Sequence, residues 1–387
     1  MTIMATSKIY LDNAATTPLD ERVIDAMCEV FKNNYGNPSA THSIGRTAKA
    51  TLENARKTIA GLINAEAREI VFTSGGTEAD NMAIRCVVND LGIKHIITSP
   101  IEHKAVLETC KILEKEGRCN VHLVSVDEKG NVDLAELEKL ASNYPKSLIS
   151  LMHANNEIAT LLDYKKVSEI AKANECIFHS DTVQSMGHYA FDVKEFGADL
   201  LTCSAHKLHG PKGVGFLYVN HQLKLKSMIT GGGQERNHRA GTENVAGIVG
   251  LEKALQLAFD QLAAEQKQIF GLKQYAIDQL CNQIEGIQIN GETSFEKALY
   301  TVLSCSVPPQ SNNALLLFKL DIAGICCSGG SACNSGAASE SHVLEAIKHP
   351  QDRQAIRFSF GRFSTQKDID EAVSALKSIL ENQTVQL

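Results

Sequence analysis

The sequence lacks the features that mark several protein classes. Its 387 residues include no tryptophan, and 45 acidic residues outnumber 38 basic ones, leaving a net charge of −7. This balance argues against binding to nucleic acid or an anionic membrane through a basic face. No apolar run approaches the length of a membrane span, and residues 1–8 hold no signal-peptide core. With 43% hydrophobic and 21% charged residues, we expect a globular, cytoplasmic protein.

The cysteines show no pattern of a disulfide or zinc framework. Eleven are present, so they cannot all pair, and no C-x-x-C occurs. Most lie in apolar runs, where a free cysteine packs as a small hydrophobe. This usage is typical of a reducing compartment. The cysteines are Cys28, Cys86, Cys110, Cys119, Cys176, Cys203, Cys281, Cys305, Cys326, Cys327 and Cys333.

Strand and helix patterns alternate through the first two-thirds of the chain. Helical spacing over residues 43–64, 103–116 and 164–174 separates short apolar runs that are rich in β-branched residues. This alternation predicts an α/β fold with a mostly parallel sheet covered by helices on both faces. The predicted strands are residues 69–74, 95–98, 121–124, 148–152, 176–180 and 199–203.

The order changes in the last third. One long helical pattern runs from residue 243 to about residue 284, and it is long enough to bridge two domains. Strands are then predicted at residues 299–307 and 355–360, and helices at residues 313–320 and 367–381. We interpret this part as a smaller α+β domain, which agrees with the chain length, since 387 residues exceed what one small core organises.

One segment does not have the composition of a packed element. Residues 328–339 are twelve consecutive small or turn-forming residues, and Cys333 lies in their middle. Such a run buries little apolar area, so we expect a mobile loop over about residues 328–340. Two interpretations of Cys333 remain: a bystander thiol, or a nucleophile on a flexible tether that reaches into a pocket and out to a partner.

Lys207 and Asp181 each follow a predicted strand. A lysine at the carboxyl end of a strand lies on the ligand-binding edge of an α/β sheet, although an isolated lysine in a Gly/Pro turn is more often a surface residue. A pyridoxal-phosphate site needs a Schiff-base lysine and a carboxylate for the ring nitrogen. Gly75, Gly76 and Thr77 stand at the start of a predicted helix. Two interpretations remain: the backbone N–H groups there bind phosphate, or Thr77 is only a local cap of the helix.

Taken in order, these motifs resemble the cysteine desulfurases, which are pyridoxal-phosphate enzymes related to class V aminotransferases. The resemblance covers essentially the whole chain. It rests on residues 10–18 (YLDNAATTP), 36–39 (GNPS), 74–78 (SGGTE), 102–104 (EHK), 155–157 (NNE), 204–207 (SAHK), 231–236 (GGGQER), 239–242 (RAGT), 329–333 (GGSAC) and 356–362 (IRFSFGR).

The resemblance implies the fold-type I architecture of pyridoxal-phosphate-dependent transferases. This fold is α/β, with a large domain built on a mostly parallel seven-stranded sheet flanked by helices and a smaller α+β C-terminal domain. We expect the large domain over residues 16–260. The small domain should then comprise residues 1–15 and 261–387, including the Cys333 loop.

The resemblance also assigns roles in binding pyridoxal 5′-phosphate. Lys207 is expected to carry the Schiff base and later move protons, and Asp181 to pair with the ring nitrogen. His103 should stack on the ring, as a catalytic as well as a binding residue, and Gln184 should bond its phenolic oxygen. The expected phosphate ligands are Gly76, Thr77, Ser204 and His206, with Thr242 reaching the phosphate from the other subunit of a homodimer.

The remaining implied roles concern the substrate, L-cysteine. Arg357 should clamp its carboxylate with help from Asn37, and Asn155 should lie beside the ring and position the substrate. Cys333 should take the sulfur as a persulfide, with release of alanine. The persulfide is expected to pass to an acceptor protein, an iron–sulfur scaffold or a sulfur carrier. No metal is expected in the site.

Three departures from the family pattern leave the reaction class intact. Thr182 and Val183 fill the gap between Asp181 and Gln184, Asn334 follows the nucleophile, and Asn237 and His238 are unfamiliar. They bear on substrate preference and partner choice. The alternatives are a selenocysteine lyase or an aminotransferase on the same scaffold, and, from another class, a protein that uses its cysteines to hold a metal or relay sulfur.

Overall fold

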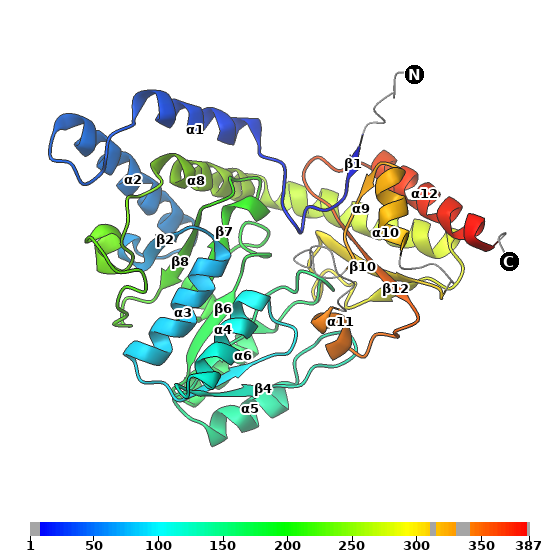
Figure 1. The fold of residues 1–387 in the computed structure, drawn as a ribbon, viewed down its shortest axis with the longest axis horizontal. Coiled ribbons are helices and arrows are strands. Elements are labelled where there is room, and N and C mark those ends of the chain that lie inside the picture. Colours follow the sequence, from blue (N-terminus) through cyan, green and yellow to red (C-terminus); the bar gives the residue numbers. More distant parts are fainter. Residues whose placement is uncertain (1–7, 310–314, 330–340, 385–387) are drawn as a thin grey trace.

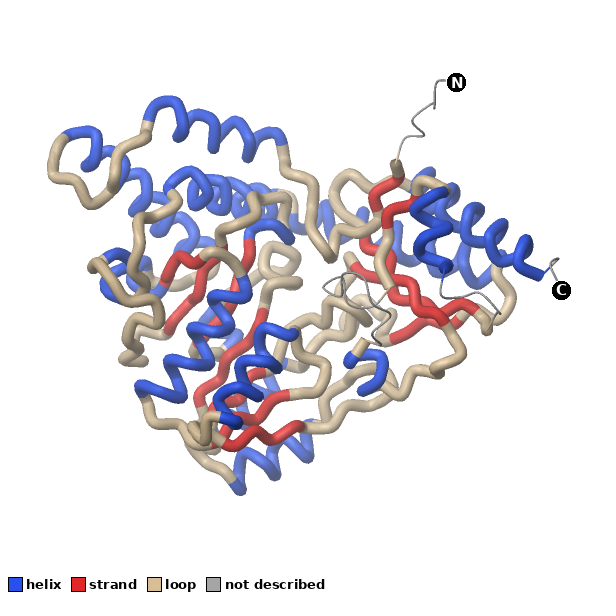
Figure 2. Tube along the Cα trace, in the orientation of Figure 1, coloured by secondary structure: helices blue, strands red, loops and turns tan. Residues whose placement is uncertain are grey.

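The computed structural model describes residues 8–309, 315–329 and 341–384. The helices and strands gather into a larger unit and a smaller one, and the first and last described elements both belong to the smaller unit (Figure 1). Figure 2 shows loops over much of the region where the two units meet, together with a helical stretch that crosses from one unit to the other. The predicted Cys333 loop lies, for the most part, outside the described residues, as does Cys333 itself.

The larger unit is built on a seven-stranded sheet with the order β2-β8-β7-β6-β5-β3-β4. Strand β8 runs antiparallel to both of its neighbours, and the other pairs are parallel. This confirms the mostly parallel seven-stranded sheet, although β8 was not among the strands predicted from the local pattern. The strands are β2 (Ile70–Thr73), β3 (His95–Thr98), β4 (Asn120–Leu123), β5 (Leu148–Ser150), β6 (Ile177–Asp181), β7 (Leu200–Ser204) and β8 (Gly215–Val219).

Helices cover both faces of this sheet. Successive side chains of a strand point to opposite faces, so Leu148 of β5 packs into the core beneath α3 and α4, while Ile149 packs into the core beneath α2, α5, α6, α7 and α8. The helices are α1 (Glu21–Asn33), α2 (Ser43–Leu62), α3 (Gly76–Asp90), α4 (Lys104–Lys115), α5 (Leu134–Asn143), α6 (Tyr164–Ala173), α7 (Val193–Phe196) and α8 (Val245–Asp260), with 3₁₀ turns at η1 (Ala67–Glu69), η2 (Ala205–Lys207) and η3 (Gln234–Asn237).

The long helical pattern predicted from residue 243 to about residue 284 is two helices. Helix α8 ends and α9 (Leu262–Gln283) begins at Gln261, whose φ of −107° and ψ of 4° depart from helical values. Neither glycine nor proline marks this break, so the local pattern runs through it without interruption. Helix α8 packs on the core of the larger unit, whereas α9 contributes Ile269, Leu272 and Leu280 to the core of the smaller one.

The smaller unit has an antiparallel sheet in the order β12-β10-β9, and a two-stranded parallel sheet of β1 and β11. Leu11, Leu303, Ile356 and Leu376 belong to one core under these sheets. Its elements are β1 (Ile9–Tyr10), β9 (Gln288–Asn290), β10 (Val302–Val307), β11 (Ile325–Cys326), β12 (Gln354–Ser359), α10 (Leu316–Ile322), α11 (His342–Ala346) and α12 (Gln366–Thr384). None of the helices in the described part of the chain combines the length and apolar character that crossing a bilayer demands.

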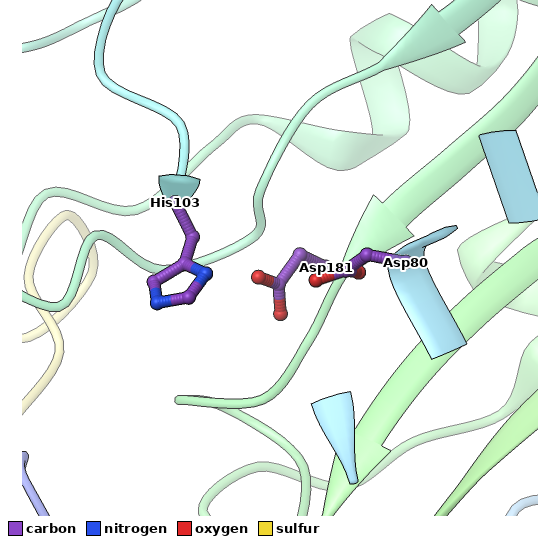
Figure 3. Close-up of side chains that lie close together, drawn as sticks. All are labelled: Asp80, His103 and Asp181. Atoms are coloured by element: carbon purple, nitrogen blue, oxygen red, sulfur yellow. The ribbon is translucent and has the colours of Figure 1, made fainter. Parts of the chain in front are cut away.

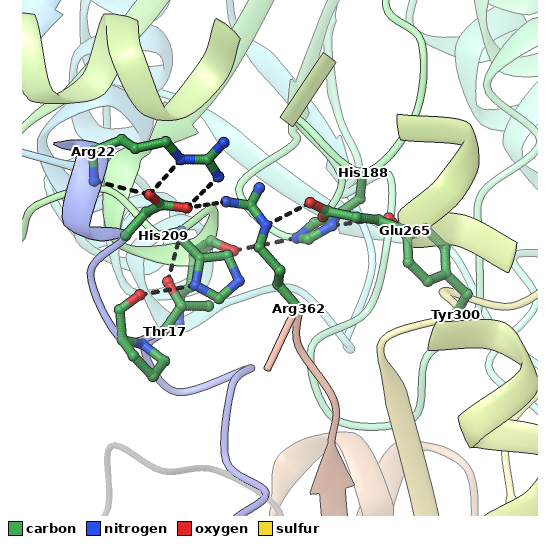
Figure 4. A network of polar contacts seen from close by, with 10 residues as sticks. Thr17, Arg22, His188, His209, Glu265, Tyr300 and Arg362 are labelled. Carbon is green, nitrogen blue, oxygen red and sulfur yellow. Dashed lines mark hydrogen bonds and ion pairs between the residues drawn. The ribbon is translucent and has the colours of Figure 1, made fainter. Parts of the chain in front are cut away.

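A buried ion-pair network joins the two units (Figure 4). The Arg362 guanidinium, just after β12, donates through Nε to Glu265 Oε1 on α9 at 2.5 Å and through Nη1 to Asp20 Oδ2 at the start of α1. Asp20 also accepts two hydrogen bonds from the Arg22 side chain at 2.7 and 2.9 Å, which lower the pKa of its carboxyl. Arg362 therefore holds three segments that are far apart in the sequence.

Replacing Arg362 should destabilise the protein far more than replacing Arg22. The Arg362 side chain is 11% exposed, as against 47% for Arg22. Arg362→Met leaves two buried carboxylates without this partner, so we expect a loss on the order of 3 kcal/mol in the free energy of unfolding. Arg22→Met is the matched control, with an expected loss of less than about 1 kcal/mol. Urea denaturation measures both, and similar small losses would contradict the prediction.

Candidate active site

A cavity of about 250 Å³ opens at the carboxyl edge of the larger sheet, against the smaller unit. Parallel strands place their carboxyl ends along the same edge, which is where ligands bind in α/β folds. Asp181 ends β6, Ser204 ends β7, and α3 begins just after β2. The cavity brings together many of the residues predicted from the sequence, namely Gly76, Thr77, His103, Asp181, Gln184, Ser204, His206, Lys207 and Arg357.

Lys207 ends the short turn η2 and presents its amine to the cavity. Its Nζ donates hydrogen bonds to the carbonyl oxygens of Ala14 and Ala15, at 2.5 and 2.8 Å. The backbone carbonyl of Lys207 is itself within 3.2 Å of His188 Nε2, and His188 Nδ1 meets the hydroxyl of Tyr300 at 3.1 Å (Figure 4). The lysine is thus held at both ends, so its amine is directed towards one wall of the cavity.

Asp181 is a buried carboxyl on the floor of the cavity. Its Oδ1 accepts a hydrogen bond from the backbone N–H of Val183 at 2.9 Å. Burial raises the pKa of Asp181, and the nearby His103 and Lys207 act in the opposite direction. One ligand atom from each of Asp80, His103 and Asp181 lies within 4.8 Å of the others (Figure 3). Asp80 is 1% exposed, so its carboxyl is shielded from solvent.

The start of α3 forms an anion-binding wall. Its N-cap residue, Gly75, has a φ of +147° and no side chain. The first backbone N–H groups of the helix are therefore not capped by the N-cap residue. A Cβ atom on Gly76 would lie only 2.8 Å from Val183 Cγ2, which leaves no room for a larger residue. The uncapped N-terminus of a 15-residue helix, with Thr77 and Ser204 beside it, fits a phosphate group.

His103 and Gln184 are positioned by hydrogen bonds to the backbone. His103 is the N-cap of α4, and its Nδ1 accepts from the N–H of Ala105 at 3.2 Å, so a neutral ring carries its proton on Nε2. Gln184 Nε2 donates to the carbonyl of Ala14 at 3.0 Å. His206 Nδ1 lies 3.2 Å from Thr16 Oγ1, and burial together with Lys207 and Lys212 lowers the pKa of His206 to about 4. His206 and Gln184 therefore reach the cavity as neutral groups, and all three side chains are oriented by these contacts.

Arg357 brings a buried cation from the smaller unit. It lies on β12 and is 1% exposed. Its Nη2 pairs with Asp12 Oδ1 at 2.9 Å, and its Nη1 donates to the carbonyl of Asn156 at 3.0 Å. Its Nε is buried and has no hydrogen-bond partner in the part of the chain that the structure describes. Because an unpaired buried donor is costly, this N–H suits a carboxylate ligand that enters the cavity.

Three predicted residues lie elsewhere in this chain. The amide of Asn155 is engaged locally, donating to the carbonyl of Ile101 at 2.9 Å and accepting from two backbone N–H groups, and the cavity is lined by Asn156 instead. Asn37 is exposed, and its Oδ1 accepts from the N–H of Ser39. Thr242 is also exposed. Neither Asn37 nor Thr242 lines the cavity.

Several residues of the site were missed in the sequence. Asn156 neighbours Asn155 in the same motif, and spacing alone does not say which of two adjacent residues faces a cavity. Asp12, Ala14 and Ala15 belong to a motif that was noted without assigning them roles. Nothing in the sequence pattern pointed to Asp80 as a residue of the site, because an aspartate within a helical pattern is ordinarily a surface residue.

The same chain is similar along nearly its whole length to known proteins. Residues 9–372 match the aminotransferase class-V family. The chain belongs to this family. It is 44% identical over 378 residues to the cysteine desulfurase IscS of Dictyoglomus turgidum, covering 97% of this chain and 95% of that protein. It is 41% identical to the putative cysteine desulfurase IscS 1 of Bacillus subtilis, covering 97% of this chain and all of that one.

Solved structures agree with these sequence relatives. A NifS-like protein superposes with a TM-score of 0.89 at 36% identity, covering 97% of this chain and all of that one. The cysteine desulfurase of Thermococcus onnurineus, solved in its apo form, gives a TM-score of 0.86 at 25% identity, covering 97% of this chain and 95% of that one. The predicted family and fold class are therefore confirmed, and the chain is a cysteine desulfurase of a family that uses pyridoxal phosphate.

Proposed function

We propose that this cysteine desulfurase converts L-cysteine to L-alanine and takes up the substrate sulfur on Cys333 as a persulfide. The observation that carries the proposal is the meeting of Lys207, Asp181 and Arg357 at one cavity. An amine, a buried carboxylate and a buried guanidinium are the groups needed to hold a pyridoxal cofactor and an amino acid beside it.

The cavity fits pyridoxal phosphate at both of its ends. The α3 N-terminus, closed to any side chain at Gly76, suits the phosphate, and the buried Asp181 suits the ring nitrogen. When bound, the cofactor supplies an electron sink for the charge that develops at the substrate Cα. We infer that Lys207 binds it covalently, with the remaining contacts from Gly76, Thr77, His103, Asp181, Gln184, Ser204 and His206.

The chain's own residues then bind the substrate and move its protons. Arg357 receives the substrate carboxylate through its unpaired Nε, while Asp12 and the carbonyl of Asn156 hold the guanidinium still. Asn156, which lines the cavity, replaces Asn155 as the residue beside the substrate in this proposal. Lys207 removes the proton from Cα, and its two carbonyl partners keep the amine on that side of the cavity.

Sulfur transfer needs a thiolate near the same cavity. The thiolate of Cys333 attacks the substrate sulfur, and an S–S bond forms as the C–S bond breaks. A proton takes the place of sulfur at Cβ. Cysteine and the enzyme thiol thus become alanine and the enzyme persulfide. Both ends of the segment that carries Cys333 support this step. Ser328 exchanges backbone hydrogen bonds with Arg357, and His342 lines the cavity with its Nε2 at 2.9 Å from the Glu102 carbonyl.

We also infer a homodimer and an acceptor protein. Large apolar side chains are exposed on α1, α2 and the segment between them, namely Ile24, Phe31, Tyr35 and Ile44. Exposed apolar patches of this kind mark interaction surfaces. The exposed positions of Thr242 and Asn37 suit contacts made in a partner's cavity rather than in their own. The persulfide passes to an iron–sulfur scaffold or a sulfur carrier.

Cys333→Ala should separate substrate binding from sulfur transfer. We expect the variant to bind the cofactor and change its visible spectrum when L-cysteine is added, while alanine and persulfide production fall by roughly a thousandfold or more. Anaerobic incubation with L-cysteine, followed by assays of alanine and protein-bound persulfide, measures this. Cys281→Ala, at an exposed thiol on α9, is the control. Full turnover by Cys333→Ala would contradict the assignment of Cys333 as the sulfur acceptor.

Gly76→Ala should weaken binding of the phosphate end of the cofactor. The added Cβ forces Val183 or the start of α3 to move, and overpacking of this kind costs about 1–3 kcal/mol. The dissociation constant for pyridoxal phosphate should rise roughly five- to a hundredfold. Absorbance titration of the apoprotein measures it. Gly61→Ala, where a Cβ meets nothing within 4 Å, should leave the constant unchanged, and equal constants for both variants would refute the phosphate assignment.

The dimer predicts a solution mass of twice 42.0 kDa by sedimentation equilibrium. Phe31→Asp places a charge in the apolar surface of α1 and α2 and should shift the mass towards the monomer, because burying an unpaired charge is costly. Phe318→Asp, at an exposed phenylalanine on α10, should leave the dimer intact. A monomeric wild-type protein, or dissociation by Phe318→Asp alone, would be evidence against this interface.

A further inference from the structure

Two carboxyl groups share the floor of the cavity. Asp181 ends β6, and Asp80 projects from α3 behind it, so that Asp181 lies between His103 and Asp80 (Figure 3). A carboxylate oxygen of Asp80 is within 4.8 Å of one of Asp181. Both side chains are buried, at 1% and 5% exposure. Two like charges this close, out of water, do not both ionise near neutral pH.

The surroundings of the two carboxyls differ sharply. Asp181 accepts a hydrogen bond from the N–H of Val183 at 2.9 Å, and the positive charges of Lys207 and His103 favour its ionised form. Among the residues that the structure describes, neither oxygen of Asp80 has a hydrogen-bond partner within normal geometry. A pair of carboxyls whose environments differ in this way divides into one acid and one carboxylate.

The nearby groups do not compensate a charge on Asp80. His179 Nε2 lies 3.6 Å away, but its ring is bonded to Ser150 and Thr202, and burial lowers the pKa of His179 to about 3. The Thr202 hydroxyl favours ionisation of Asp80, whereas Glu102 opposes it. Glu102 is itself buried, and burial raises its pKa to about 8 although it accepts hydrogen bonds from Ser99 and Met152.

We propose that Asp80 is a protonated, neutral carboxyl at neutral pH and serves as a positioning residue that leaves the negative charge of this floor on Asp181. The protonation state is a property of the chain alone. Its consequence for the cofactor rests on the proposed function: the ring nitrogen then faces one negative charge instead of two, and Asp181 is backed by a neutral group of matching shape.

Protonation of Asp80 in the folded chain makes the free energy of unfolding fall as the pH rises. Burial, with the charge of Asp181 next, raises the pKa of Asp80 well above the value of about 3.9 in an unfolded chain. The folded chain therefore holds one more proton than the unfolded chain from about pH 4 up to the raised pKa. Over that window the stability that this proton supplies is lost as the pH rises.

Asp80→Asn tests the proposal, because it is a neutral isostere that cannot ionise. In urea denaturation of the cofactor-free protein, the unfolding constant of the wild type relative to Asp80→Asn should rise about tenfold per pH unit above roughly pH 4. Glu102 is present in both proteins, so the ratio isolates Asp80. Asp278→Asn, at an exposed aspartate on α9, should give a flat ratio. A flat ratio for Asp80→Asn as well, or one that falls with pH, would overturn the proposal.

A second measurement needs no unfolding. The infrared difference spectrum between wild type and Asp80→Asn at pH 7 should contain the carbonyl band of a protonated carboxylic acid, and a carboxylate band in its place would overturn the assignment. Asp80→Ser replaces Asp80→Asn if the latter does not fold. Since both measurements use the apoprotein, their failure would leave the proposed desulfurase reaction standing, and loss of that reaction would not alter them.

Discussion

The ion pair between Arg357 and Asp12 is the interaction on which the cavity depends. Arg357 lies on β12 of the smaller sheet, whereas the other walls come from the larger sheet and its loops. The guanidinium contacts Asp12 and the carbonyl of Asn156, so it binds the N-terminal segment to a loop of the larger unit. Arg357 therefore brings a cation from the smaller unit to the cavity, and Asp12 holds it in place.

The N-terminal segment that contains Asp12 also positions the Lys207 side chain. Residues that follow Asp12 supply the two carbonyls that hold the Lys207 amine and the carbonyl that orients Gln184. The segment is anchored in turn by Asn13 and Ala14, whose donors bond Ser359 at the end of β12. One stretch of chain near the N-terminus thus sets the relative positions of the carboxylate end and the lysine end of the site. A shift of this stretch moves both ends together.

Charge is distributed unevenly around the cavity. The buried cations lie towards the smaller unit and at Lys207, and the carboxyls lie on the floor provided by β6 and α3. Between buried groups such as Arg357 and Asp181 these interactions are stronger than at the surface. The proposed function accordingly places the substrate carboxylate at Arg357 and the substrate amino group towards Lys207.

The ends of the strands were predictable because the strands of a buried parallel sheet have a simple pattern of apolar residues in the sequence. Apolar runs bounded by helical spacing revealed β2, β3, β5, β6 and β7, and the residues that follow such strands lie on one edge by geometry. Lys207, Asp181 and Gly76 were found in this way. The break at Gln261 was not found, because no glycine or proline marks it, and strand β8 was not found although the Gly/Pro turn at residues 210–213 precedes it. The remaining site residues were proposed through the family resemblance rather than from the local pattern.

The amino-acid sequence by itself determined the fold class, the family, and the edge of the sheet where the chemistry lies, because these depend on periodicity and on motifs a few residues long. Only the tertiary structure decided that Asn156 rather than Asn155 faces the cavity, that Arg357 pairs with Asp12 across 345 residues, and that Asp80 stands behind Asp181. These facts are contacts between segments far apart in the chain. No local pattern encodes them, because which side chains meet, and which are shielded from water, is settled only when the two units pack together.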